Sequence, residues 1–127
     1  MSANQHQFAA ISNCQEYVIG TAELQVNANQ RMRHSGFISM IVHEDYQDKG
    51  VGTALLKKLI DVADNWLMLV RVELVVFEDN KSAIHLYEKL GFEKEGLKKY
   101  AAIKKGRYEH AYLMARINPN FRITQSE

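Results

Sequence analysis

The strongest chemical signal in the sequence is a glycine-containing segment, Gln47-Asp48-Lys49-Gly50-Val51-Gly52-Thr53. Gly50 and Gly52 let the backbone approach a ligand closely, because they carry no side chain. The segment precedes a helical pattern, and the first N–H groups of a helix have no intrahelical acceptor. With the positive end of the helix dipole, these donors suit a phosphate or pyrophosphate group. The alternative is a strand-to-helix turn that binds nothing.

Two other nucleotide-binding motifs fit this segment less well. A Walker A loop needs the order Gly-Lys-Ser/Thr, whereas Lys49 precedes Gly50 here. A dinucleotide-binding fingerprint needs a third glycine where Leu55 stands. Its first glycine also follows the strand directly, whereas seven residues separate Val42 from Gly50. Both motifs are therefore disfavoured.

A second segment, residues 80–92, places chemically useful side chains on a short expected helix. Asn80 and Tyr87 are seven residues apart, about two helical turns, so both can face one groove. By periodicity alone, Tyr87 belongs to the apolar stripe of this helix, together with Ala83 and Leu90. A core tyrosine with a satisfied hydroxyl is therefore the alternative to a ligand-binding role for Tyr87.

The elements that must position these segments are strands and two helices. Apolar or alternating runs predict the strands, and apolar residues at helical spacing predict the helices. The expected strands are Phe8–Ser12, Tyr17–Val26, Gly36–Val42, Val72–Phe77, the stretch from Phe92 to Ile103, and Tyr108–Ile117. The expected helices are 51–66, whose apolar face includes Trp66, and 81–90, which Asp79 and Asn80 cap.

The order of these elements is β-β-β-α-β-α-β-β, which predicts an α/β fold built on one mixed β-sheet. The first strands are expected to pair antiparallel, and the long helix is expected to make a parallel crossover. The strand at residues 36–42 is mostly apolar, which favours a central place in the sheet. Gly20, within the second strand, predicts a bulge or a close backbone approach.

Length and composition predict a single domain covering residues 1–127, with 46% apolar and 24% charged residues. The net charge of +1 excludes a polyanion-binding footprint over the whole surface. Residues 97–127 nevertheless carry seven basic and two acidic side chains. This stretch is interpreted as a solvated hairpin, with attraction of an anionic ligand as the alternative. No nucleic-acid partner is expected, because aromatic residues are not interleaved with the basic ones on a defined face.

Cys14 is the only cysteine, so this chain can form no intramolecular disulfide, and the cytoplasm is the expected compartment. No stretch reaches the roughly 18 apolar residues that a membrane span needs, so no membrane partner is expected. His43 is followed by Glu44 and Asp45, but a third placed ligand is missing. No metal site is therefore expected.

The two segments together resemble the motifs of the GCN5-related N-acetyltransferase (GNAT) family. The cofactor motif of that family, Gln/Arg-x-x-Gly-x-Gly/Ala, is matched by residues 47–52. Its second motif has an Asn and a small residue before Leu/Tyr-Tyr-x-Lys-x-Gly-Phe, and is matched by Asn80, Ala83 and residues 86–92. Spacing and element types agree from Phe8 to Arg116. Bacterial stand-alone enzymes that acetylate amino acids or small amines are the most similar type.

This resemblance implies an enzyme that transfers the acetyl group of acetyl-CoA to a primary amine of a small molecule or amino acid. It implies that the pantetheine arm pairs with the backbone of Ile41 and Val42, and that backbone N–H groups from Asp48 through Thr53 hold the pyrophosphate. The implied cofactor contacts are Ile41, Val42, Gln47, Asp48, Lys49, Gly50, Val51, Gly52, Thr53, Asn80 and Tyr87. Tyr87 is also the implied general acid, which protonates the leaving thiolate.

The sequence departs from the family pattern at its start. A complete member opens with a strand and one or two helices before the strand that corresponds to Phe8–Ser12, whereas seven residues precede Phe8 here. An N-terminally shortened fold is therefore expected, with a homodimer covering the exposed apolar surface and supplying part of the acceptor pocket. The alternative function is a non-catalytic acyl-CoA-binding module. No general base is assigned, although Glu23 and Glu73 are candidates.

Overall fold

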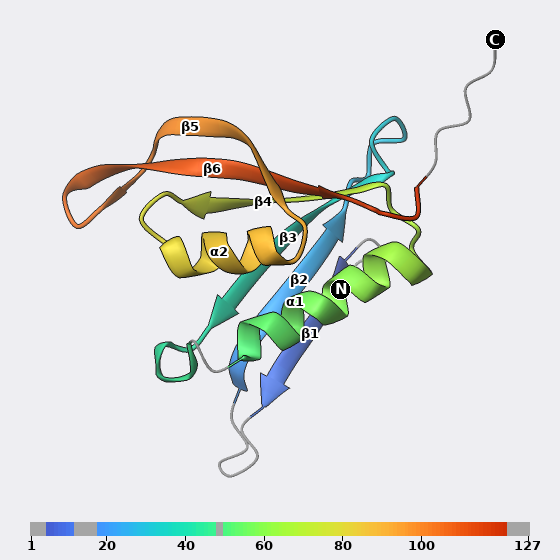
Figure 1. Ribbon diagram of the computed structural model, residues 1–127, viewed down its shortest axis with the longest axis horizontal. Coiled ribbons are helices and arrows are strands. Elements are labelled where there is room, and N and C mark those ends of the chain that lie inside the picture. Colours follow the sequence, from blue (N-terminus) through green and yellow to red (C-terminus); the bar gives the residue numbers. More distant parts are fainter. Residues whose placement is uncertain (1–4, 12–17, 48–49, 122–127) are drawn as a thin grey trace.

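A computed structural model describes residues 5–11, 18–47 and 50–121 (Figure 1). The strands are β1 (Gln5–Ile11), β2 (Val18–Val26), β3 (Ser35–Val42), β4 (Arg71–Phe77), β5 (Glu93–Lys104) and β6 (Arg107–Ile117). The helices are α1 (Val51–Asp61) and α2 (Lys81–Lys89), with a 3-10 turn η1 (Glu44–Tyr46) and a π-helical turn η2 (Val62–Trp66). The expected α/β order is confirmed, and the two short turns are additions to it. Cys14 lies outside the described residues.

The strands form one mixed sheet in the order β1-β2-β3-β4-β6-β5. Neighbouring strands pair antiparallel except β3 and β4, which are parallel. A parallel pair needs a crossover connection, and α1 supplies it, as the sequence predicted. β3 is central, as expected. The last two strands exchange places relative to the chain order, because the hairpin folds back and lays β6 beside β4.

The parallel pair of β3 and β4 is short and then opens. Three residue pairs join these strands, from Ser35 with Arg71 to Phe37 with Glu73. Beyond that point, residues 38–42 of β3 and 74–77 of β4 do not pair with each other, and the strands diverge in Figure 1. We call this opening the fork. The edge of β3 along the fork therefore carries backbone groups that no neighbouring strand pairs.

The two faces of the sheet differ in what covers them. Both helices pack on one face, where alternate strand residues join the core. The core cluster includes Ala22, Leu24, Ile38, Leu55, Leu56, Leu59, Val72, Leu74, Val76, Ile84, Tyr87, Phe92 and Met114. Within the described residues, no helix lies against the other face, which we call the open face. The open face exposes apolar side chains, namely Phe37, Ile41, Val75 and Phe77.

α1 packs closely over β2 at Gly20. A Cβ atom at this position would lie 3.2 Å from the carbonyl oxygen of Ile41 and 3.2 Å from side-chain atoms of Val51 and Leu55. The close backbone approach expected at Gly20 is therefore confirmed. It brings the first turn of α1 onto the end of β3, where the fork is open.

The long helix expected over residues 51–66 changes its winding before it ends. α1 stops at Asp61, and the N–H group of Leu67 then donates to the carbonyl oxygen of Val62 in a π-helical turn. This wider turn shifts the helical periodicity by a residue. Trp66 consequently points outward and is 76% exposed. Its prediction as a buried residue was wrong for this reason, whereas Ala63 is buried as expected.

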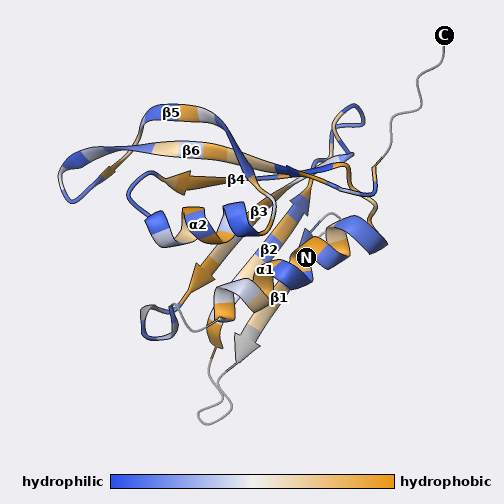
Figure 2. Ribbon diagram, in the orientation of Figure 1, coloured by the Kyte–Doolittle hydropathy of each residue, from blue (hydrophilic) through white to orange (hydrophobic). Residues whose placement is uncertain are grey.

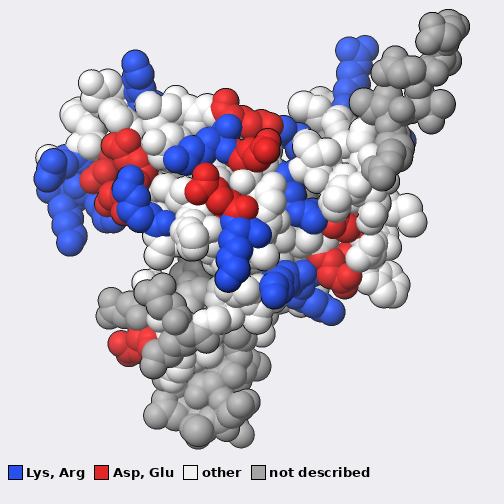
Figure 3. Space-filling view, viewed as in Figure 1, with Lys and Arg blue, Asp and Glu red and all other residues white. Residues whose placement is uncertain are grey.

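The hairpin of β5 and β6 extends beyond the rest of the sheet (Figure 1). Its turn is hydrophilic in Figure 2, and Lys and Arg side chains gather at this end in Figure 3. Lys105 and Arg107 are exposed there. Lys104 approaches Asp79 at the end of β4, with 3.5 Å between Nζ and Oδ2. The basic stretch is therefore a largely solvated hairpin, as the sequence predicted.

Asn80 caps α2, because its side-chain oxygen accepts a hydrogen bond of 3.3 Å from the N–H group of Ala83. Asn80→Ala is expected to lower the free energy of unfolding by about 1 kcal/mol, the usual cost of removing an N-cap. Urea unfolding would record a lower midpoint with an unchanged slope. Asn80→Asp keeps a capping oxygen and should retain the wild-type midpoint. Equal losses in both variants would contradict the capping role.

Candidate active site

A cavity of about 250 Å³ lies on the helix-covered side of the fork, between the end of β3, the first turn of α1 and the inner side of α2. We call it the cleft. Its lining residues are Met40, Val42, Gln47, Gly50, Gly52, Thr53, Asn80, Ser82, Ala83, Leu86 and Tyr87. The fold thus brings together residues 47–53, predicted to hold a phosphate, and the segment of Asn80 and Tyr87, predicted to face one groove.

Gly50 precedes α1 with a φ of 85°, a left-handed conformation that favours glycine. The first intrahelical hydrogen bond runs over 3.0 Å from the N–H group of Ala54 to the Gly50 carbonyl, and no side chain caps the helix. The N–H groups of residues 51–53 therefore have no intrahelical acceptor, and no acidic residue lies in the first turn. This end of α1 suits an anionic group of a ligand.

Gly52 keeps the cleft open. A Cβ atom there would lie 3.3 Å from Cε of Met40, 3.7 Å from Cγ2 of Val42 and 3.8 Å from Cδ2 of Leu86. A larger residue would therefore fill the space between β3 and α2. Gln47 ties the segment that follows β3 back to the end of that strand, because its side-chain amide donates to the Val42 carbonyl over 3.2 Å.

Tyr87 reaches the cleft from α2, and its side chain is buried. Its ring packs against Phe92, with 5.8 Å between the centroids. Burial raises the pKa of the Tyr87 phenol above its ordinary value, so the hydroxyl stays protonated at neutral pH. Within the described part of the chain, no hydrogen bond reaches this hydroxyl. It can therefore donate its proton to a ligand in the cleft.

The predicted cofactor contacts divide into three groups. Those that line the cleft are Val42, Gln47, Gly50, Gly52, Thr53, Asn80 and Tyr87. The side chains of Ile41 and Val51 do not: Ile41 is 73% exposed on the open face, and Val51 packs against the core. Val51 can serve the cleft through its backbone N–H group. The backbone of Ile41 instead bonds Thr21 of β2, so the backbone groups of β3 that face the fork are those of Met40 and Val42. Asp48 and Lys49 lie outside the described residues.

Some cleft residues were not among the predicted contacts, namely Met40, Ser82, Ala83 and Leu86. Strand alternation could have identified Met40, which shares a face of β3 with Val42. Helical spacing could have identified the other three, because they surround Tyr87 on the inner side of α2.

The described residues contain no group of three His, Cys, Asp or Glu side chains that could hold a metal ion. Nδ1 of His43 lies 3.7 Å from Oδ2 of Asp45, and the His43 ring packs edge-on against the ring of Tyr46. Over the same part of the chain, no helix is both long and apolar enough to cross a membrane.

Known proteins are similar to this chain in both sequence and fold. A family model described as the acetyltransferase (GNAT) family matches residues 2–92. The L-amino acid N-acetyltransferase AaaT of Escherichia coli (strain K12) is 40% identical over 100 residues, which cover 79% of this chain and 62% of that protein. Spermidine N(1)-acetyltransferase of the same strain is 34% identical over 104 residues, which cover 82% of this chain and 55% of that protein.

A crystal structure of a GNAT-family acetyltransferase from Streptococcus pneumoniae has a TM-score of 0.83 and 31% identity, covering 91% of this chain and 68% of that one. The chain spans 62% of the length of AaaT and 55% of that of the spermidine enzyme. The family match runs from β1 through α2 and so includes the fork and the whole cleft. The chain therefore belongs to the acetyltransferase (GNAT) family.

Proposed function

We propose that the protein transfers the acetyl group of acetyl-CoA to a primary amine of a small molecule. The convergence of three features on the cleft carries this proposal: free N–H groups at the start of α1, an unpaired edge of β3 and a protonated tyrosine hydroxyl. They suit, in turn, the pyrophosphate, the amide-containing pantetheine arm and the thioester sulfur of acetyl-CoA. A site for phosphate alone would need only the first of them.

The binding roles follow from what each group can donate or accept. Backbone N–H groups at residues 50–53 hold the pyrophosphate, and Gln47 lines the same cleft. The pantetheine arm pairs with β3 as an added strand in the fork, through the backbone groups of Met40 and Val42, because those of Ile41 bond β2. Asn80 borders the cleft, and its NH₂ group is available to the arm while its oxygen caps α2.

The transfer step starts from a neutral amine. Its nitrogen attacks the carbonyl carbon of the thioester, and backbone N–H groups at the fork stabilise the resulting oxyanion. The carbon–sulfur bond then breaks, and the leaving thiolate takes the proton of the Tyr87 hydroxyl. The surplus proton of the amine passes to solvent, and Tyr87 regains a proton from water. The products are the N-acetylated amine and coenzyme A.

The names of the relatives support a small acceptor. One relative is named for L-amino acids and another for spermidine. Both kinds of molecule carry a primary amine, so we assign this class to the present chain.

We also propose a cytoplasmic homodimer. The exposed apolar side chains of the open face, Phe37, Ile41, Val75 and Phe77, support a second copy that packs beside the fork and supplies part of the acceptor pocket. The single cysteine within the chain suits a reducing compartment. Light scattering at micromolar concentration should give the mass of a dimer, and a stable monomer would contradict this assembly.

Incubation with acetyl-CoA and a panel of small amines tests the proposed activity. Equal amounts of free coenzyme A and N-acetylated amine are expected, measured by thiol release and by mass spectrometry. Binding of acetyl-CoA without transfer to any amine would favour a non-catalytic acyl-CoA-binding module instead. Absence of both binding and transfer would contradict the proposed function.

A further inference from the structure

Glu73 occupies the closed end of the fork. It forms the last pair between β4 and β3, with Phe37, before the two strands diverge. Val75, the next residue of β4 on the same face, lies along the fork, about 7 Å further at the usual strand rise. Glu73 and Val75 both belong to the open face, opposite the helix-covered face that carries the cleft. An acceptor that enters the fork from the open face therefore passes the Glu73 carboxylate.

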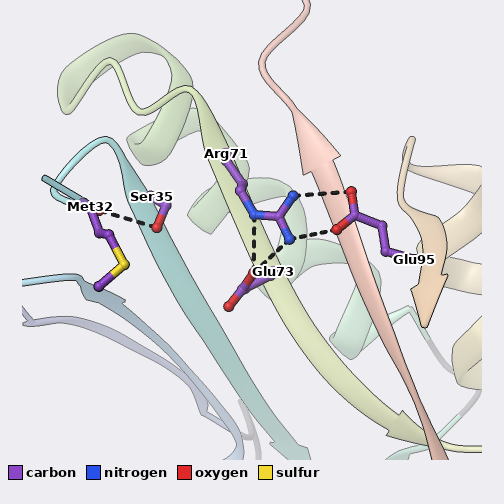
Figure 4. A network of polar contacts seen from close by, with 5 residues as sticks. All are labelled: Met32, Ser35, Arg71, Glu73 and Glu95. Carbon is purple, nitrogen blue, oxygen red and sulfur yellow. Dashed lines mark hydrogen bonds and ion pairs between the residues drawn. The ribbon is translucent and has the colours of Figure 1, made fainter. Parts of the chain in front are cut away.

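A second cavity, of about 240 Å³, lies at this closed end. Its polar side chains come from Gln25, Asn27, Ser35 and Glu73, and Phe37 forms an apolar wall. The Ser35 hydroxyl donates to the carbonyl oxygen of Met32 over 3.2 Å (Figure 4). With its proton engaged there, the Ser35 oxygen is left as an acceptor toward the cavity. The cavity therefore places one carboxylate among neutral polar side chains.

Arg71 fixes the position of the Glu73 carboxylate. Its Nε and Nη2 donate to Oε2 of Glu73 over 3.1 and 2.7 Å. The other side of the guanidinium donates to both oxygens of Glu95 on β5, over 3.0 and 2.6 Å. Figure 4 shows Arg71 between the two carboxylates. Arg71 thus bridges Glu73 on β4 and Glu95 on β5, although β6 lies between these two strands. The bridge can pass over β6 because the β6 residue that pairs with Glu73 is the small Ala115.

The bridge of Arg71, Glu73 and Glu95 carries a net charge of one negative unit, and one oxygen of Glu73 accepts no hydrogen bond within the described residues. Two carboxylates face a single guanidinium, and hydrogen bonding to Arg71 holds the pKa of Glu95 below its usual range, so the Glu95 charge persists. Both hydrogen bonds to Glu73 end on Oε2, and within the described residues none reaches Oε1. A fixed carboxylate oxygen in a cavity whose lining residues include no Lys or Arg suits a protonated amine.

We propose that Glu73 binds a second, protonated amine of the acceptor, so that the preferred substrate is a diamine, and that Arg71 is the positioning residue that holds the Glu73 carboxylate. This inference rests on the proposed acetyl transfer. One amine of the acceptor reaches the thioester through the fork as the neutral nucleophile. The other amine stays charged and is held at the closed end of the fork by the Glu73 carboxylate.

The test compares diaminobutane with butylamine, which lacks the second amine, at saturating acetyl-CoA. For the unmodified protein, kcat/KM for diaminobutane should exceed that for butylamine by about tenfold or more, mainly through KM, since a hydrogen bond to a charged group has this size. Glu73→Gln should remove most of this preference, by raising KM for diaminobutane toward the KM for butylamine. Arg71→Lys keeps the positive charge, but an ammonium cannot donate to Glu73 and Glu95 from two sides as the planar guanidinium does. This variant should raise KM for diaminobutane and not KM for butylamine.

Glu93→Gln is the matched control. Glu93 lies on β5, where it pairs with Ala115 of β6, and it takes no part in the bridge. The substitution therefore removes a negative charge two strands away from Glu73. It should preserve the preference for diaminobutane, and an equal loss in Glu93→Gln would overturn the assignment to Glu73. A fall in kcat for both amines with an altered pH profile in Glu73→Gln would assign proton transfer instead.

Two results with the unmodified protein separate the inference from the function on which it rests. Equal kcat/KM for diaminobutane and butylamine would contradict the Glu73 site and leave acetyl transfer intact. Transfer to neither amine, nor to any other amine of the panel, would contradict both. Calorimetric binding of acetyl-CoA, measured in parallel, establishes that each variant retains its cleft.

Discussion

Tyr87→Phe is expected to lower kcat by roughly 100-fold or more, because general acid catalysis typically contributes ~10²–10⁴-fold. The thiolate would then leave without a proton donor beside it. The phenylalanine ring retains the packing against Phe92, so the affinity for acetyl-CoA should change little. Steady-state kinetics and calorimetric titration with acetyl-CoA measure the two quantities separately.

Tyr108→Phe serves as the control for this variant, since Tyr108 is 66% exposed on the hairpin and lies away from the cleft. It should leave turnover unchanged. Because the pKa of Tyr87 lies above its ordinary value, activity that depends on its proton should persist through the neutral range and decline only in strongly alkaline solution. Undiminished turnover in Tyr87→Phe would remove Tyr87 as the proton donor.

Gly52→Val is expected to weaken acetyl-CoA binding by roughly 100-fold, a free energy in the range that overpacking typically costs. The new side chain would begin 3.3 Å from Met40 and extend into the space between Val42 and Leu86. Calorimetric titration measures the loss, and circular dichroism establishes that the fold persists.

Gly96→Val provides the matched substitution outside the cleft. Gly96 lies on β5, and a Cβ atom there would meet no atom within 4 Å. This variant should bind acetyl-CoA like the unmodified protein. If Gly52→Val also bound normally, the ligand would not occupy the cleft between β3 and α2.

Local patterns predicted the elements of the fold well. Apolar periodicity located both helices and the strands, with ends that differ by a few residues, as for β1, which begins at Gln5 rather than Phe8. The exceptions have non-local or irregular causes. The π-helical turn rotates Trp66 outward. β5 accommodates bulges, at one of which Tyr100 takes a φ of 53° and donates its N–H to Nδ1 of His110 over 2.9 Å.

The cleft could be anticipated because each of its halves is a short contiguous segment. The glycine-containing segment and the motif around Tyr87 can both be recognised in the sequence, and the crossover of α1 brings them together. The second cavity could not be anticipated in this way. Its residues come from β2, β3 and β4, and the bridge from Arg71 to Glu95 depends on the exchange of β5 and β6 in the sheet. Strand order and register are set by packing across the whole fold.

Calorimetric titration of acetyl-CoA into the purified protein, with coenzyme A as comparison, tests most directly that the cleft is a site for this cosubstrate. Saturable binding of one molecule per chain is predicted, and it should be abolished or greatly weakened in Gly52→Val. Ligand at about 100 times its dissociation constant should also raise the free energy of unfolding by roughly 2.7 kcal/mol. Absence of binding heat, together with an unchanged unfolding midpoint, would contradict the assignment of the cleft to acetyl-CoA.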